Sequence, residues 1–208
     1  MSLPRITFFY APQTRAGGTL ALLEELGAQY HLHLLDLKAG TQRAPEYLAI
    51  NPMGKVPAIV HDGALVAEQP AVFVYLADLY PGKGLAPPIG DPLRGPYLRW
   101  LVFYGSCFEP AIVDRAMKRE PAAPSTSPYG TWEQVYATLV AQLADGPWLL
   151  GERFTAADVL WGTALNWTTR FQLVPEHPAI RGYIDRVLAR PAMRRAMAKD
   201  AGYAAQQA

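Results

Sequence analysis

The sequence predicts an α/β domain followed by an all-helical domain. Strand and helix patterns succeed one another in the order βαβ-α-ββα near the N-terminus, a stretch rich in proline and glycine follows, and only helical patterns come after it. A chain of 208 residues is long enough for two small domains. We therefore expect domains at 1–80 and 93–208, joined by a linker at 81–92.

Periodicity and turn residues predict the elements of the first domain. Leucines at helical spacing end at Gly27, a residue typical of a helix C-cap. The Asp62-Gly63 pair lies between two short apolar runs and indicates a hairpin. Pro70 suits the first turn of a helix, where its missing N–H costs nothing. The predicted elements are a strand at 5–10, a helix at 15–27, a strand at 30–37, a short helix at 43–50, strands at 57–60 and 64–67, and a helix at 69–79.

The second domain reads as helices separated by loops. Pro110 predicts a kink or break in the first of them. Thr155 and Asp158 have the spacing of a capping box, with Phe154 and Val159 at the hydrophobic-staple positions, so we interpret this segment as structural. The predicted helices are 93–118, 131–145, 156–172, 179–190 and a short one after Pro191, with a loop at 119–130.

Composition excludes several classes of function. The formal net charge is +1 and no segment holds a dense run of Lys or Arg, which argues against nucleic-acid binding. No apolar run approaches the roughly 20 residues that a membrane span needs. We see no signal peptide and expect a cytoplasmic protein. Cys107 is the single cysteine, and the four histidines lack ligand spacing, so we expect no disulfide, no CxxC pair and no metal site.

Three segments carry candidate chemistry, and each has a plain structural alternative. Thr14 lies where a helix begins, so it either helps to hold an anion or serves only as an N-cap. A cis bond between Val56 and Pro57 would present the Val56 backbone to an extended peptide ligand, whereas a trans bond would make an ordinary turn. Glu68 and Gln69 either bind the ammonium and carboxylate of an amino acid or form a capping pair.

Taken in order, these segments resemble the soluble glutathione transferases. The matching text is FFYAPQTRAGGTLALLEELG, APEYLAINPMGKVPAIV, LVAEQPAVFVYLADLYP and GERFTAADVLWGTAL, which together run through nearly the whole chain at the family's spacing. The resemblance implies a thioredoxin-like N-terminal domain that binds glutathione, a homodimer, and a role in detoxification. It also implies that Pro57 is cis and that the Val56 backbone pairs with the cysteinyl part of glutathione.

The resemblance assigns the remaining glutathione contacts to specific residues. Glu68 and Gln69 are implied to hold the γ-glutamyl end, although many members have Ser in place of Gln69. Lys55 either reaches the glycyl carboxylate or lies solvated in its loop. Many members carry a serine two residues after the proline that this chain has at Pro12, followed by an arginine, and here those positions are Thr14 and Arg15.

Thr14 is therefore the first candidate for stabilising the thiolate. Tyr10, at the end of the first strand, is the second, with Arg15 as a helper. Members with a reactive cysteine would carry it at position 15, so cysteine-type chemistry is excluded, and we expect Cys107 to be a packed thiol.

The resulting hypothesis is a glutathione transferase that attacks a small apolar electrophile bound between the domains. Most of the aromatic residues in the helical half fit its core, and Tyr104, Phe108 and Trp167 are the ones that we expect to contact the electrophile. A peroxidase or isomerase would be a variant that uses the same site. The alternatives are a glutathione-binding protein with little or no catalysis and, less in keeping with the lack of a cysteine at the helix start, a thiol-disulfide oxidoreductase.

Overall fold

The structure is a computed structural model that describes residues 6–120 and 122–207. These residues fall into two compact units, one made of 6–83 with 191–207 and the other of 84–190. The C-terminal segment therefore groups with the first unit, whereas the sequence placed it in the helical domain. Each unit is described by itself below.

The first unit contains a four-stranded mixed sheet with the order β2-β1-β3-β4. Its strands are β1 (Ile6–Tyr10), β2 (Tyr30–Leu34), β3 (Ala58–His61) and β4 (Ala64–Val66). β1 pairs in parallel with β2 and antiparallel with β3, with Phe9 opposite Ala58. Position 5, where the sequence begins its first strand, lies outside the described residues. The predicted hairpin is confirmed, since His61 pairs with Ala64 and both Asp62 and Gly63 have positive φ, as a tight I′-type turn requires.

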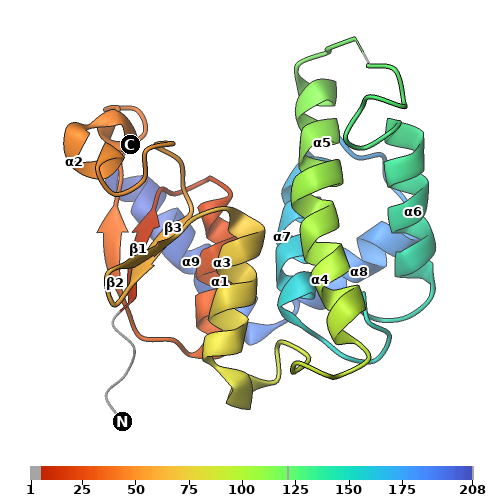
Figure 1. The fold of residues 1–208 in the computed structure, drawn as a ribbon, viewed down its shortest axis with the longest axis horizontal. Helices are drawn as coiled ribbons and strands as arrows, with labels where there is room; N and C mark the ends of the chain where they lie inside the picture. The colour runs from red at the N-terminus through yellow and green to blue at the C-terminus, as the bar shows by residue number, and fades with distance from the viewer. Residues whose placement is uncertain (1–5, 121, 208) are drawn as a thin grey trace. The chain divides into compact units, whose positions relative to one another are not determined.

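Helices lie on both faces of this sheet (Figure 1). α1 and α3 pack against each other, and Phe8 and Tyr10 lie on the opposite face of β1 from Phe9. Phe9 packs with Tyr47 of α2, Leu35 and Ala58 in a small apolar cluster. Gly27 caps α1 in the left-handed conformation, as predicted. The helices of this part are α1 (Ala16–Leu26), η1 (Thr41–Arg43), α2 (Pro45–Leu48), α3 (Gln69–Leu79) and η2 (Pro81–Lys83).

The C-terminal helix differs most from the expectation. The sequence predicts a short helix after Pro191, but α9 extends from Pro191 to Gln206 and packs along α1 (Figure 1). Ala192, Met193 and Ala196 are its buried residues. Only this narrow stripe of small or apolar side chains is buried. Such a stripe gives a weak periodic signal, so the sequence did not show the full length of the helix.

The second unit is all-helical, as the sequence predicts. The expected helix at 93–118 is interrupted by a π-helical turn, η3, which ends just before Pro110. Pro110 has no N–H to donate to the preceding turn, which accounts for the irregularity that its presence predicts. The helices are α4 (Arg94–Phe103), η3 (Tyr104–Phe108), α5 (Glu109–Ala116), α6 (Trp132–Ala144), α7 (Ala156–Arg170) and α8 (Pro178–Leu188).

Two features hold the helical unit together. Trp161 is fully buried among Trp100, Tyr104 and Phe108, and its indole N–H donates to the carbonyl of Trp100 at 3.0 Å. At the start of α7 the carboxylate of Asp158 accepts the N–H of Thr155 at 2.8 Å, so the predicted capping box is present.

Candidate functional site

The loop between β1 and α1 carries the first candidate residues. α1 begins at Ala16, and the Thr14 hydroxyl oxygen accepts its N–H at 3.2 Å. The same hydroxyl donates to the carbonyl of Ala11 at 2.7 Å. Thr14 thus caps the helix and is partly exposed, while Arg15 is exposed. The hydroxyl would have to rotate away from Ala11 to donate to a ligand.

Tyr10 has a different environment from Thr14. It is fully buried, and its hydroxyl donates to the carboxylate of Asp200 in α9. Burial first, and then the hydrogen bond and negative charge of Asp200, raise the pKa of Tyr10 far above its ordinary value. The phenol therefore keeps its proton, and that proton is directed to Asp200.

The turn before β3 carries the second set. The carbonyl of Lys55 accepts the Tyr47 hydroxyl at 2.6 Å and the Asn51 amide at 2.9 Å. Gly54 has φ +57°, and a β-carbon there would lie 2.7 Å from the carbonyl oxygen of Gln42, so only glycine fits this turn. The turn is thus held by one side chain from α2, by one from the residues after it, and by a close backbone approach.

The candidate residues of this turn lie at its end. The bond between Val56 and Pro57 is cis, as predicted. Val56 is partly buried and Lys55 is exposed. Because Ala58 lies opposite Phe9, these residues lie beside the end of β1, where the loop with Thr14 begins.

The start of α3 carries the third set. Glu68 is exposed and has φ +64° and ψ 113°, a conformation that is costly for a residue with a side chain and is typical of functional sites. Gln69 is almost buried, and its amide nitrogen donates to the carbonyl of Arg15 at 2.9 Å. This bond ties the start of α3 to the loop that carries Thr14. The first unit therefore brings all three predicted segments together.

The candidate electrophile contacts lie in the helical unit. Tyr104 and Phe108 are 2% and 0% exposed, and both rings pack on Trp161. The Tyr104 hydroxyl donates to Glu109. These two residues are part of the helical core, whereas Trp167 is partly exposed and packs edge-on against Phe171. Of the three, only Trp167 has appreciable surface available to a ligand.

Sequence reasoning missed Asp200. This residue accepts both the Tyr10 hydroxyl and the backbone N–H of Gln13, the latter at 3.0 Å. Gln13 itself has φ +56°. A long C-terminal helix and the positive φ of a residue before α1 are not visible in local periodicity, so no signal in the sequence pointed to this contact.

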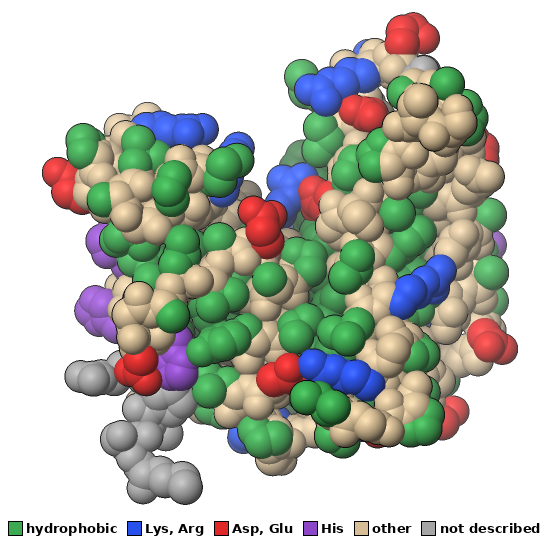
Figure 2. Space-filling model, in the orientation of Figure 1, with side chains coloured by type: hydrophobic (Ala, Val, Ile, Leu, Met, Phe, Trp, Pro, Cys, Tyr) green, Lys and Arg blue, Asp and Glu red, His purple; other side chains and the backbone are tan. Residues whose placement is uncertain are grey.

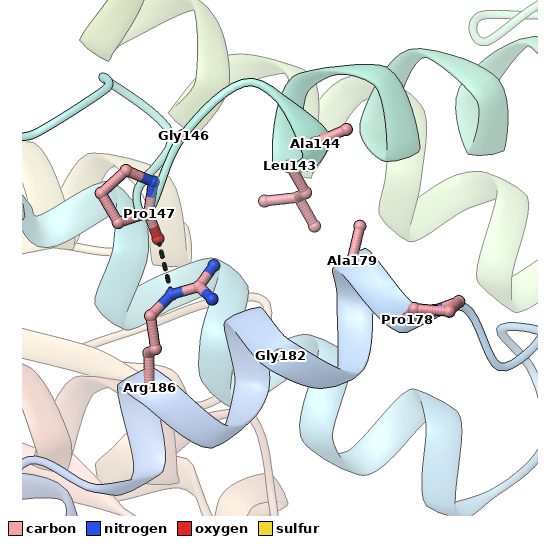
Figure 3. A pocket seen from close by; sticks show the side chains of 8 residues that line it. All are labelled: Leu143, Ala144, Gly146, Pro147, Pro178, Ala179, Gly182 and Arg186. Carbon is pink, nitrogen blue, oxygen red and sulfur yellow. Dashed lines mark hydrogen bonds between the residues drawn. The ribbon is translucent and has the colours of Figure 1, made fainter.

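Other cavities lie away from these residues. Figure 3 shows one of about 430 Å³ between the end of α6 and α8, lined mainly by Gly, Ala and Pro, in which the Arg186 guanidinium donates to the carbonyl of Pro147 at 3.1 Å. A second, of about 330 Å³, lies beside β2 and α2. Neither is lined by a predicted site residue.

Among the described residues, neither the charges on the face in Figure 2 nor metal-ligating side chains indicate a separate site. Acidic and basic side chains are interspersed on the face seen in Figure 2, without a large area of one sign. Within residues 6–120 and 122–207 there is no group of three or more His, Cys, Asp or Glu side chains that could hold a metal ion. None of the helices in that part of the chain is long and apolar enough to cross a membrane.

Comparison with known proteins decides the family. Residues 4–78 match the glutathione S-transferase N-terminal domain, and residues 130–191 match the C-terminal domain of the same family. A glutathione transferase structure from Methylococcus capsulatus is 30% identical, with a TM-score of 0.80 over 94% of this chain and 98% of the other. This chain belongs to the glutathione S-transferase family.

Two further relatives bear on function within the glutathione S-transferase family. A sphingomonad glutathione S-transferase, solved in complex with glutathione, is 30% identical, with a TM-score of 0.77 over 94% of this chain and 98% of its own. The disulfide-bond oxidoreductase YfcG of Escherichia coli K12 is 29% identical over 93% of this chain and 95% of its own length. Family membership fixes a thioredoxin-like domain followed by an all-helical one, and it leaves the reaction to be argued from the site.

Proposed function

We propose that this protein is a glutathione transferase that ionises the glutathione thiol beside Thr14. The observation that carries the proposal is the hydrogen bond from Gln69 to the carbonyl of Arg15, which joins the start of α3 to the loop before α1. The Val56 backbone would pair with the cysteinyl part of glutathione, and Glu68 and Gln69 would bind its γ-glutamyl end. Lys55, which is exposed, would attract the glycyl carboxylate.

The proposed chemistry is attack by a thiolate. An ordinary cysteine thiol has a pKa of about 8.5, and lowering it to about 6.5 requires roughly 2.7 kcal/mol of preference for the anion. A hydroxyl bond to an anion supplies roughly 1.5–3 kcal/mol. A helix N-terminus adds about 0.3–1 kcal/mol. The combined contributions of the Thr14 hydroxyl and the start of α1 are therefore large enough for this pKa shift, and Arg15 adds a further positive charge. The thiol proton leaves to water, and the sulfur forms a bond to the electrophilic carbon while the bond from that carbon to its leaving group breaks. With an aryl halide, the halide ion departs with the electron pair.

Access favours Thr14 over Tyr10 for this role. The Tyr10 side chain has no exposed surface and already donates its proton to Asp200. The Thr14 hydroxyl is partly exposed, and rotation about one bond frees its proton from Ala11. A hydroxyl that changes acceptor when the thiolate arrives can still supply most of a charge-assisted hydrogen bond.

Three single variants test the assignment. Thr14→Val keeps the shape and removes the hydroxyl, so it should slow conjugation of an apolar aryl halide by tenfold or more, at about 1.4 kcal/mol per decade. It should also raise the thiol pKa seen in the pH–rate profile. Tyr10→Phe and Cys107→Ala should leave that pKa nearly unchanged. A large effect of Tyr10→Phe with none of Thr14→Val would make the tyrosine the thiolate partner.

A second candidate is a glutathione-binding protein with little catalysis. The Thr14 hydroxyl already donates to the carbonyl of Ala11, and the carboxylate of Asp200 accepts the Gln13 N–H in the same loop. Both features weaken the stabilisation of an anion by this loop. This candidate would be favoured if calorimetry showed that glutathione binds while assays detected none of four reactions: conjugation, peroxide reduction, disulfide reduction and double-bond isomerisation. Loss of calorimetric binding itself would remove both.

Assembly is a separate proposal that rests on the family alone. We propose a homodimer, because soluble glutathione transferases are generally two-fold dimers. Sedimentation at micromolar concentration should give twice the chain mass of 22.8 kDa, and a stable monomer would contradict the proposal.

A further inference from the structure

Within the first unit, the C-terminal helix is fixed to α1 by ionic contacts as well as by packing. Arg195 donates to the carboxylate of Glu24 in α1 at 2.9 Å, and Lys199 donates to the same carboxylate. The Tyr203 ring lies edge-on to Tyr10, with centroids 5.7 Å apart. These contacts define the position of α9 along α1 and therefore the position of Asp200.

Asp200 lies over the first turn of α1. One oxygen, Oδ1, accepts both the Tyr10 hydroxyl and the Gln13 N–H. A β-carbon built on Gly17 would lie 3.9 Å from the same oxygen, so the carboxylate comes close to the helix backbone itself. The residue that follows Gln13 is Thr14, so the carboxylate bonds to the backbone directly before the residue that we propose stabilises the thiolate.

We propose that Asp200 is a positioning residue that holds the loop carrying Thr14 and limits how strongly this loop stabilises an anion. The inference rests on the proposed function, because it concerns the same thiolate. Its first part follows from the Gln13 N–H, whose bond to Asp200 fixes a residue with φ +56° directly before Thr14. Left-handed backbone at a residue with a side chain needs such support from its surroundings.

The second part follows from charge. A carboxylate beside a helix N-terminus uses the same partial positive charge that would favour a thiolate, and its own charge repels that anion. Tyr10 faces Asp200, Tyr203 and Tyr30. Tyr30 in turn faces Lys199 and Glu24, and Glu24 is bonded to Lys199 and Arg195, while Arg15 lies in the loop itself. The two α9 cations are bonded to Glu24, so they offset the Asp200 charge only partly.

The isosteric variant Asp200→Asn separates charge from geometry. Its amide oxygen can accept both hydrogen bonds, so the Michaelis constant for glutathione should stay within about twofold, while the thiol pKa should fall by about half a unit or more. A fall in the thiol pKa is a readout that a merely structural role would not give.

Asp200→Ala removes both functions of the carboxylate. Exchange of the Gln13 amide hydrogen, followed by NMR without glutathione, should become at least tenfold faster, because local opening releases this amide. The catalytic constant should fall and the Michaelis constant for glutathione should rise.

Asp114 offers a matched control. It accepts the Tyr129 hydroxyl at 2.8 Å in the helical unit, so Asp114→Asn alters a second Tyr–Asp pair without touching the loop. This variant should change neither the thiol pKa nor Gln13 exchange.

The outcomes distinguish this inference from the proposed function. An unchanged thiol pKa in Asp200→Asn, or unchanged Gln13 exchange in Asp200→Ala, would overturn the inference while the transferase stands. A wild-type protein that neither binds nor ionises glutathione would overturn the function, and it would overturn with it the effect assigned to the Asp200 charge. The amide exchange would still decide whether Asp200 holds the loop.

Discussion

Each unit contains a fully buried tyrosine that donates its hydroxyl to an aspartate, and these two pairs have different settings. In the helical unit Tyr183 donates to Asp158 at 3.0 Å, and both side chains are 0% exposed. Asp158 also accepts N–H groups of Leu149 and Thr155, so its oxygens are satisfied by the protein. In the first unit Tyr10 is buried, but Asp200 is partly exposed.

The difference shows what the aspartate carboxylate does in each place. Asp158 joins α7, the preceding loop and α8, so its contacts serve the fold. Asp200 connects the C-terminal helix with the loop of Thr14, and its remaining surface meets solvent. A Tyr–Asp pair therefore stabilises the fold of the helical unit. In the first unit, by our inference, it limits how strongly the loop carrying Thr14 stabilises an anion.

The largest expected effect comes from Asp158→Ala. It leaves two backbone N–H groups buried without acceptors and leaves the Tyr183 hydroxyl with only the residue 158 carbonyl, at 3.4 Å, which should lower the free energy of unfolding by about 3 kcal/mol or more. Chemical denaturation of the purified protein measures this. The control is Asp185→Ala, at an exposed position of α8. A loss below about 1 kcal/mol would mean that water replaces the carboxylate, in contrast to the satisfied network that we describe.

Gly54→Ala should affect both stability and binding. Positive φ and the clash with the carbonyl of Gln42 should together cost about 2 kcal/mol, and the displaced turn should weaken glutathione binding. Gly40→Ala is the control, because Gly40 has φ +76° with nothing within 4 Å of the added carbon. It should cost about 1 kcal/mol and leave binding unchanged. Equal effects on binding, measured by calorimetry, would contradict the role given to the turn.

The two tyrosines provide a direct comparison of the pairs. Tyr183→Phe should lower the free energy of unfolding by about 1–2 kcal/mol, because Asp158 loses a donor that no water can replace. Tyr10→Phe should lower it by about 0.5–1 kcal/mol, because solvent reaches the carboxylate of Asp200. Thermal and chemical unfolding of the two variants under one condition test the difference. A larger loss for Tyr10→Phe would reverse the comparison.

Most of the fold could be predicted from the sequence, because its signals are local. Apolar spacing, Gly27, the Asp62-Gly63 turn and the Thr155–Asp158 box each predict a feature that the structure contains. The approach of the candidate segments could not be predicted from spacing, because the bond between Gln69 and Arg15 joins residues distant in sequence. Only the family resemblance supplied it.

Three features that local patterns did not predict have a common cause. The length of α9 and the contact of Asp200 with Tyr10 depend on packing against α1, which periodicity does not show. The burial of Phe108 also depends on tertiary packing, since Trp161 covers its ring from another helix. Helical spacing shows that an aromatic residue faces a neighbour, and only the structure shows which one.

The smallest expected effect tests how α9 is attached to the first unit. Glu24 lies between Lys199 and Arg195 of α9. Burial acts to raise the pKa of Glu24, but hydrogen bonds from Lys199 and Arg195 outweigh burial and bring the pKa below its ordinary value of 4.5. A carboxyl whose pKa is lowered by folding adds stability above its unfolded-state pKa, and this contribution is lost as the pH falls through the folded-state pKa.

Glu24→Gln should therefore lower the free energy of unfolding at neutral pH by up to about 1 kcal/mol, since the two cations are partly exposed. The difference from wild type should shrink as the pH falls below about 4.5, and it should also shrink as salt is added. Glu176→Gln is the control, because Glu176 forms an exposed pair with Arg181 in the helical unit at 3.6 Å. If Glu24→Gln left both stability and Gln13 exchange unchanged at every pH, packing alone would hold α9, and Asp200 would keep its position without the ionic contacts.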